Sequence, residues 1–154
     1  MGTVKWGILG AAKIAREQVI PAMKKSKNTE LYAIASREIS KAEDFCHKFS
    51  ITKAYDDYNK LISDPNIDAV YIPLPNHLHV PFSINALKAG KHVLCEKPIS
   101  ITSDEIFELI EVQKETKKII SEAFMVRFHP QWIQTKKLIQ EGEIGKLNAI
   151  QGLF

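Results

Sequence analysis

The sequence predicts a doubly wound α/β domain, and three observations support that prediction. Short apolar segments of strand type alternate with segments of helical periodicity along most of the chain. The strand-like segments are apolar on both faces, as expected in a sheet that helices cover on both sides. A glycine turn follows the first strand-like segment, at the point where the first strand of a parallel sheet connects to its crossover helix.

The expected strands are short and rich in β-branched or aromatic residues. They lie at residues 4–9, 31–35, 52–55, 69–72, 92–95 and 119–124. Successive strands separated by helices pair in parallel, so their carboxyl ends meet at one edge of the sheet. Ligands of such sheets bind beyond that edge. We therefore expect the chemistry to lie directly after the strands.

Helical patterns fill the segments between the strands and continue after the last one. They begin near Ala12 and then cover residues 41–49, 56–62, 81–89, 102–117 and 130–140. Pro21 is expected to interrupt or kink the first helix, because proline lacks the N–H that a helix interior needs. Thr102 and Glu105 have the spacing of a capping box at a helix start.

The final residues predict the start of a second domain. Gly145 opens a turn that leads into a strand-like segment at 146–154, which has no partner in the first sheet. We expect residues 1–125 to form the doubly wound domain. Residues 126–154 are then a connecting helix and the first strand of a second α/β domain that is cut off. The chain is accordingly expected to be the front part of a longer protein.

Composition and charge exclude several classes of protein. The chain has 154 residues, of which 45% are apolar and 25% charged, as in an ordinary soluble domain. No apolar run approaches the roughly 20 residues of a membrane span. The net charge of +3 is mild, and its densest basic patch (Lys24, Lys25 and Lys27) lacks interleaved aromatics, so we expect neither a membrane nor a nucleic-acid partner. Two cysteines make no disulfide framework, and we expect the cytoplasm.

The first strand runs into a turn that resembles a dinucleotide fingerprint. That fingerprint is Gly-x-Gly-x-x-Gly/Ala between strand and helix, and this chain offers Gly10, Ala12 and Ala15. The first glycine makes the tight turn, and the second lets the backbone approach a pyrophosphate. Ala12 is the smallest departure at that second position. The backbone amides of Ala11, Ala12, Lys13 and Ile14 are expected to face the phosphates at the helix start.

The end of the second strand distinguishes the two nicotinamide cofactors. NAD enzymes place an acidic residue there for the ribose hydroxyls, whereas this chain has Ser36 and Arg37. A guanidinium pairs with a 2′-phosphate and stacks on adenine, and a serine hydroxyl adds a hydrogen bond. NADP is therefore favoured. Glu38 keeps NAD open as the alternative.

Two more loops follow the fourth and fifth strands. Asn76 could cap a helix or bind the cofactor, and one of His77 and His79 is expected near the nicotinamide ribose. These two histidines are two positions apart and lack further ligands nearby, so no metal site is expected. Lys97 directly follows the fifth strand between a carboxylate and a proline, where its ammonium can act on a substrate oxygen. An exposed ion pair of structural use only is the plainer interpretation of that tripeptide.

Four stretches together resemble a known family. The chain is similar to the Gfo/Idh/MocA oxidoreductases at residues 10–15, 73–79, 89–98 (AGKHVLCEKP) and 127–130 (RFHP). Its sequence looks nearest to the dihydrodiol dehydrogenase and xylose dehydrogenase branch. The run at 89–98 is specific, whereas the glycine turn is not. The resemblance implies a Rossmann domain that binds NAD(P), followed by an α/β domain that forms the substrate wall and the usual dimer interface. A homo-oligomer is therefore expected of the full-length protein.

The resemblance also implies roles for individual residues. Lys97, in the family's Glu-Lys-Pro motif, is the expected catalytic residue, which binds and polarises the reacting hydroxyl or carbonyl. Further candidates for cofactor contact are Pro73, Leu74, Asn76, His79, Glu96 and, just past the sixth strand, Arg127. The expected reaction is hydride transfer between nicotinamide and a sugar, polyol or cyclic alcohol. The rest of such a site comes from the second domain, so the isolated chain is expected to be inactive.

A second class of function stays open at this point. Some proteins of this fold bind the dinucleotide as a signal and regulate without turnover. Lys97 favours catalysis, because a sensor does not need it.

Overall fold

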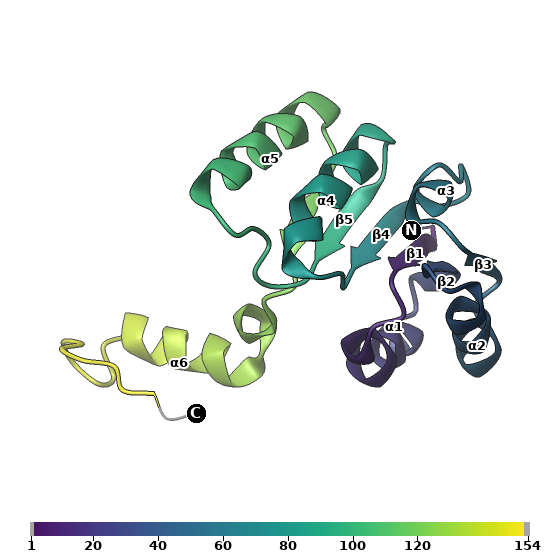
Figure 1. Cartoon of the computed structure of the whole chain (residues 1–154). Coiled ribbons are helices and arrows are strands. Elements are labelled where there is room, and N and C mark those ends of the chain that lie inside the picture. Colours follow the sequence, from purple (N-terminus) through teal and green to yellow (C-terminus); the bar gives the residue numbers. More distant parts are fainter. Residues whose placement is uncertain (1, 153–154) are drawn as a thin grey trace. The chain divides into compact units, whose positions relative to one another are not determined.

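The computed structural model describes residues 2–152. The chain forms two compact units, Met1–Ala123 and Phe124–Phe154, and the first contains the sheet (Figure 1). This division lies close to the predicted one after residue 125. What the two parts are as domains stays a prediction.

Within the described residues, six parallel strands form a single sheet in the order β3-β2-β1-β4-β5-β6. The strands are β1 (Val4–Leu9), β2 (Thr29–Ala35), β3 (Lys53–Tyr55), β4 (Ala69–Ile72), β5 (His92–Cys95) and β6 (Ile120–Glu122). From β1 the chain first adds β2 and β3 on one side of the sheet and then adds β4, β5 and β6 on the other side. The strand order therefore reverses between β1 and β4, and in such sheets a crevice forms there beyond the carboxyl ends of the strands. The predicted doubly wound class is confirmed.

Helices cover both faces of this sheet. They are η1 (Ala15–Val19), α1 (Ile20–Lys25), α2 (Ile39–Phe49), α3 (Tyr58–Ile62), η2 (Asn76–Leu78), α4 (His79–Lys88) and α5 (Ser103–Thr116). One buried cluster joins β1, β4 and β5 to α3, α4 and α5 through Leu61, Val80, Leu87 and Leu109. A second joins the other face to α1 and α2 through Ile20, Ala42 and Phe45. The two apolar layers fix the strand ends that carry the predicted site.

The first helix changes its winding where the sequence predicts an interruption. Residues Ala15–Val19 are π-helical, and the Ile20 N–H donates to the Ala15 carbonyl. The α-helical part then begins at Ile20 with Pro21 in its first turn. Pro21 lies within a continuous helical segment from residue 13 to residue 25, and the N–H that it lacks agrees with a change of winding in the preceding turn.

The helix after β5 begins as its sequence predicts. The Thr102 hydroxyl accepts from the Glu105 N–H, and the Glu105 carboxylate accepts from the Thr102 N–H. This is the reciprocal capping box. It fixes the start of α5, whose Leu109 and Val112 are buried in the apolar cluster shared with α4 and the sheet.

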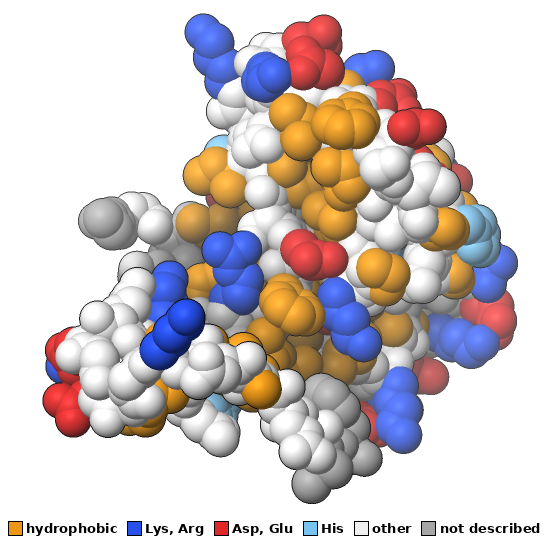
Figure 2. All heavy atoms as spheres, turned by 90° about the vertical axis from the view of Figure 1, so that its left-hand side faces the viewer, with side chains coloured by type: hydrophobic (Ala, Val, Ile, Leu, Met, Phe, Trp, Pro, Cys, Tyr) orange, Lys and Arg blue, Asp and Glu red, His pale blue; other side chains and the backbone are white. Residues whose placement is uncertain are grey.

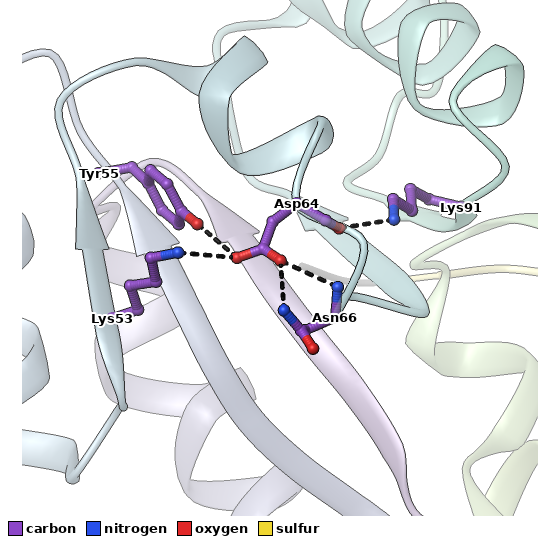
Figure 3. A network of polar contacts seen from close by, with 5 residues as sticks. All are labelled: Lys53, Tyr55, Asp64, Asn66 and Lys91. Carbon is purple, nitrogen blue, oxygen red and sulfur yellow. Dashed lines mark hydrogen bonds and ion pairs between the residues drawn. The ribbon is translucent and has the colours of Figure 1, made fainter.

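A polar network ties the edge strand β3 to the turns before β4 and β5 (Figure 3). The buried Asp64 carboxylate accepts from the Tyr55 hydroxyl, from Lys53 Nζ at 3.1 Å and from the Asn66 N–H at 2.9 Å. The Tyr55 hydrogen bond is the main reason that the pKa of Asp64 lies well below its usual range. Lys91 Nζ donates to the carbonyls of Asp64 at 2.7 Å and Ile67 at 2.8 Å, and burial lowers the pKa of Lys91.

The second unit consists of η3 (Met125–Phe128), α6 (Pro130–Gln140) and an irregular segment. None of the residues of α6 is buried. Residues 146–152 form no strand, because a lone strand leaves its backbone groups unpaired. The last two residues of the predicted strand lie outside the described part of the chain.

Hydrophobic side chains reach the surface on the side drawn in Figure 2. Large exposed apolar residues occur in both units and include Phe107, Ile119, Phe128 and Trp132. Among residues 2–152, none of the helices combines the length and the apolarity that a bilayer span requires.

Candidate functional site

The turn after β1 has the geometry that a pyrophosphate cradle needs. Gly10 is buried with φ +112°, and its N–H donates to the Ala35 carbonyl at 2.8 Å. A Cβ at this position would lie 3.1 Å from Leu74 Cδ2 in a backbone conformation that L residues rarely adopt. Only glycine fits here without strain. Ala11 and Ala12 follow, half-buried, and the chain is helical from Lys13.

This turn fits the dinucleotide that its sequence predicts. The first N–H groups of a helix have no partner within the helix and attract anions. The small side chains of Ala11 and Ala12 leave the backbone accessible to a ligand. The predicted group Gly10, Ala11, Ala12, Lys13 and Ile14 therefore lies together in one segment.

The loop after β2 presents one free cation. Ser36 is buried, and its hydroxyl accepts from the Glu38 N–H at 3.3 Å. The Glu38 carboxylate pairs with Lys41 Nζ at 2.7 Å, one turn into α2. Arg37 is exposed, and no ion pair joins it to another described residue. Its guanidinium is available to an external anion.

The loop after β4 lies against the glycine turn. Pro73 and Leu74 are buried, and the side chain of Leu74 approaches Gly10. Asn76 begins the short helix η2 and is exposed, so its amide is free to contact a ligand.

His79 was predicted to line the nicotinamide side of the cofactor site, but it does not lie at the surface of this loop. Its side chain is fully buried at the start of α4. Nδ1 lies 2.7 Å from the Pro98 carbonyl oxygen and Nε2 lies 2.7 Å from the Leu74 carbonyl oxygen. Both ring nitrogens therefore lie against carbonyl oxygens of the protein's own backbone. His79 links the loop after β4 to the loop after β5 and offers no polar atom to a ligand.

The loop after β5 is attached to its neighbours through backbone and side chain. The Glu96 N–H donates to the Ile72 carbonyl at 3.1 Å, which places this loop beside the end of β4. The Glu96 carboxylate accepts from the Tyr71 hydroxyl at 2.7 Å and from the Lys97 N–H at 3.3 Å. The Lys97–Pro98 peptide bond is cis. The Lys97 side chain is exposed and, among the described residues, forms no ion pair.

The predicted residues of the first unit therefore meet at the carboxyl edge of the sheet. Direct contacts link the loops after β1, β4 and β5, and the loop after β2 is joined through the Gly10–Ala35 hydrogen bond. Arg127 lies in η3 of the second unit and is exposed.

Tyr71 belongs to this edge, although the sequence did not point to it. It lies in the apolar segment 69–72, which was predicted as a strand and nothing more. A buried tyrosine hydroxyl requires a hydrogen-bond partner, whereas phenylalanine would not. The presence of a tyrosine in an otherwise apolar strand was therefore the one signal in the sequence that could have pointed to a hydrogen-bond role for this residue.

Neither a group of metal-ligating side chains nor a reactive thiol is found at this edge among the described residues. Within the described residues, no group of three or more histidine, cysteine, aspartate or glutamate side chains is placed to hold a metal ion. Burial raises the pKa of the Cys95 thiol to about 12, so the thiolate that a nucleophile requires does not form near neutral pH.

Comparison with known proteins agrees with this geometry. Residues 4–124 match the family model described as the oxidoreductase family with an NAD-binding Rossmann fold. The chain belongs to the Gfo/Idh/MocA oxidoreductase family. The predicted family is thus confirmed, together with a Rossmann domain that binds a nicotinamide dinucleotide.

Its curated relatives include proteins named as oxidoreductases and dehydrogenases. An uncharacterised oxidoreductase of Rhizobium meliloti is 47% identical over the whole chain, which covers 46% of that protein. The NADP-dependent D-xylose 1-dehydrogenase 2 of Haloferax volcanii is 39% identical over 97% of the chain and 45% of the relative. The trans-1,2-dihydrobenzene-1,2-diol dehydrogenase of Mus musculus is 33% identical over 98% of the chain and 46% of the relative.

Solved structures of this family share the fold closely. A 3-ketoreductase from Actinomadura kijaniata in complex with NADP and TDP-benzene superposes with a TM-score of 0.87 at 36% identity. The match covers 92% of this chain and 43% of the reductase. The chain spans slightly less than half the length of the relatives that it matches.

Proposed function

We propose that the whole protein is an NAD(P)-dependent oxidoreductase, of which this chain is the cofactor-binding part. The reaction is hydride transfer between the nicotinamide and the oxygen-bearing carbon of a sugar, polyol or cyclic alcohol. The observation that carries the proposal is the meeting of Gly10, Leu74 and the Glu96–Lys97 loop at one edge of the sheet. Relatives that act on D-xylose and on a dihydrodiol support the substrate class.

Each loop has one task in this scheme. Gly10 makes the tight turn, and the backbone N–H groups of Ala11 to Ile14 hold the pyrophosphate, while the Gly10 N–H is bound to the Ala35 carbonyl. Ser36 and Arg37 hold the adenosine end. Pro73, Leu74, Asn76 and Glu96 line the nicotinamide end. His79 keeps the loops after β4 and β5 together from below, because its ring is buried between their carbonyls.

Lys97 is assigned to the reacting oxygen. The nicotinamide supplies or accepts the hydride. An ammonium beside the substrate oxygen stabilises negative charge that develops on it and exchanges a proton with it. Lys97 suits this role because it is exposed at the sheet edge and has no carboxylate partner among the described residues.

NADP is the preferred cofactor in this proposal. Arg37 is free, whereas the nearby acidic residue that favours NAD is already engaged by Lys41. A free guanidinium attracts the 2′-phosphate that only NADP carries. In the same proposal, the full-length protein is a homo-oligomer, and the isolated 154-residue chain does not turn over substrate. Location in the cytoplasm stays a prediction from the sequence.

Two experiments test the proposal. Titration of this chain with NADPH, followed by the nucleotide's fluorescence, is expected to show saturable binding at micromolar concentration. Turnover is then measured in the full-length protein with a panel of sugars and cyclic alcohols. Lys97→Ala is expected to reduce kcat by roughly 10²- to 10⁴-fold while NADPH binding persists.

The outcomes separate the enzyme from a regulator. Tight NADPH binding without turnover on any substrate would favour the dinucleotide sensor. Unchanged kcat in Lys97→Ala would remove this lysine from the mechanism. Absence of binding of both NADPH and NADH would contradict the cofactor assignment itself.

A further inference from the structure

A buried tyrosine lies directly beneath the loop that carries Lys97. Tyr71 is in β4 and none of its surface is exposed. Its ring packs in the cluster that joins the sheet to α1 and α2. Its hydroxyl donates to Glu96 Oε1 at 2.7 Å, across to the loop after β5. Packing alone would be served by phenylalanine, so the hydroxyl is present for this contact.

The direction of this hydrogen bond is fixed by chemistry. Burial, and after it the Glu96 carboxylate, raises the pKa of Tyr71, so the phenol stays protonated. The phenol is therefore the donor and the carboxylate the acceptor. The other carboxylate oxygen, Oε2, accepts from the Lys97 N–H at 3.3 Å. Each Glu96 oxygen is thus directed by one donor from the protein.

Glu96 keeps acceptor capacity for a ligand. A carboxylate has about four lone-pair sites, and the two protein donors occupy two of them. The Glu96 side chain is half-buried, so part of its surface is accessible at the carboxyl end of β5. A ribose hydroxyl or a carboxamide N–H is the donor that such an oxygen recognises. Tyr71 has no exposed surface and acts on a ligand only through Glu96.

We propose that Tyr71 is a positioning residue that holds the Glu96 carboxylate, and with it the Glu96–Lys97 loop, in the orientation that binds the nicotinamide riboside end of the cofactor. The inference rests on the proposed function, because it concerns the same cofactor site. Its physical basis is preorganisation. A carboxylate that is held in place loses less side-chain freedom when the cofactor binds.

A double-mutant cycle tests this role with the 154-residue chain. Tyr71→Phe removes only the hydroxyl, Glu96→Ala removes its acceptor, and the double variant removes both. NADPH affinity is measured by fluorescence titration for the four proteins. Tyr71→Phe is expected to weaken binding roughly 5- to 20-fold in the wild-type background. In the Glu96→Ala background, Tyr71→Phe is expected to change affinity less than about twofold.

The control variant is Tyr32→Phe. Tyr32 is a half-buried strand tyrosine in β2, which packs against the sheet core. Its conversion is expected to leave NADPH affinity within about twofold of the wild type. The thermal unfolding midpoint is recorded for every variant.

Several results would overturn the inference. NADPH affinity in Tyr71→Phe equal to that of the wild type would make the hydroxyl irrelevant to binding. An equal loss of NADPH affinity in the wild-type and Glu96→Ala backgrounds would mean that the hydroxyl does not act through Glu96. A Tyr71→Phe chain that is unfolded at 20 °C would make the role of the hydroxyl purely structural. Failure of the wild-type chain to bind either NADPH or NADH would overturn the proposed function and this inference together. Binding by the wild type with no coupling would overturn this inference alone.

Discussion

Arg37 is the residue on which the cofactor preference depends. It is exposed after β2 and has no acidic partner among the described residues. Arg37→Ala is expected to weaken NADPH binding by roughly tenfold, because a hydrogen bond between charged groups contributes about 1.5–3 kcal/mol. NADH affinity should stay within about twofold. Parallel fluorescence titrations with the two nucleotides measure both.

Lys25→Ala supplies the matched control for this variant. Lys25 is an exposed cation at the end of α1, so its loss changes net charge equally. An equal decrease of NADPH affinity in both variants would mean that Arg37 acts through general attraction rather than through contact with the 2′-phosphate.

Asp64 is the residue on which stability at acid pH depends. Its folded-state pKa is lowered by the Tyr55 hydroxyl first, so the folded protein favours the carboxylate. That stabilisation is fully present above the unfolded-state pKa of about 3.9 and declines as the pH falls below it. Asp64→Asn is expected to reduce the free energy of unfolding by roughly 1–3 kcal/mol at pH 7.

Urea denaturation at several pH values measures this effect. The difference between wild type and Asp64→Asn should narrow between about pH 4 and pH 2, as the wild-type carboxylate takes up its proton. Asp57→Asn is the control, because the Asp57 side chain caps α3 from an exposed position. A constant difference across that pH range would show that the Asp64 contacts act through shape rather than charge.

At the level of residues, backbone requirements could be predicted better than side-chain direction. Gly10 was expected in a tight turn and adopts a positive φ, because the strand-to-helix turn demands it. His79 was expected at the cofactor but is buried. Its direction depends on where α4 begins, and the helix starts two residues before the predicted Pro81. Tyr71 could not be distinguished from core, since its partner lies 25 residues away.

Among the elements, a local capping signal located the start of α5. The capping box at Thr102 depends on residues three apart, so the sequence alone contains it. The π-helical turn before Pro21 could not be predicted in this form. A missing N–H indicates that the α-helical pattern must change, but tertiary packing selects how it changes.

Helix α5 provides the test at this scale. Thr102→Ala removes the side-chain acceptor for the Glu105 N–H and is expected to lower the free energy of unfolding by about 1 kcal/mol. Ser103→Ala, one residue further into the same helix, should change it by less than about 0.5 kcal/mol. Chemical denaturation of both variants measures the difference. Equal stability of the two variants would contradict a stabilising role of the cap.

For the whole molecule, the alternation of strands and helices was sufficient to predict the parallel sheet. Crossovers with a fixed hand leave few topologies for such a pattern. The strand predicted after Gly145 is not formed in residues 146–152, because a strand needs a neighbour for its backbone hydrogen bonds. Such long-range partners are the information that a local pattern does not contain.

The two compact units lead to a prediction about independent folding. A chain shortened to residues 1–123 retains the sheet, both apolar clusters and every predicted cofactor residue except Arg127. The removed part has no buried residue in α6 and exposes Phe128 and Trp132. The shortened chain should therefore keep its urea midpoint within about 0.3 M and self-associate less. Denaturation and analytical ultracentrifugation measure these two properties.

NADPH titration of the same shortened chain decides the role of Arg127. If the first unit holds the whole dinucleotide site, its affinity should stay within about threefold of that of the 154-residue chain. Arg127→Ala in the longer chain is the matched variant and should then be equally neutral. A similar loss of affinity in both would instead assign Arg127 to the cofactor site. A loss in the shortened chain alone would mean that other residues of the second unit support binding.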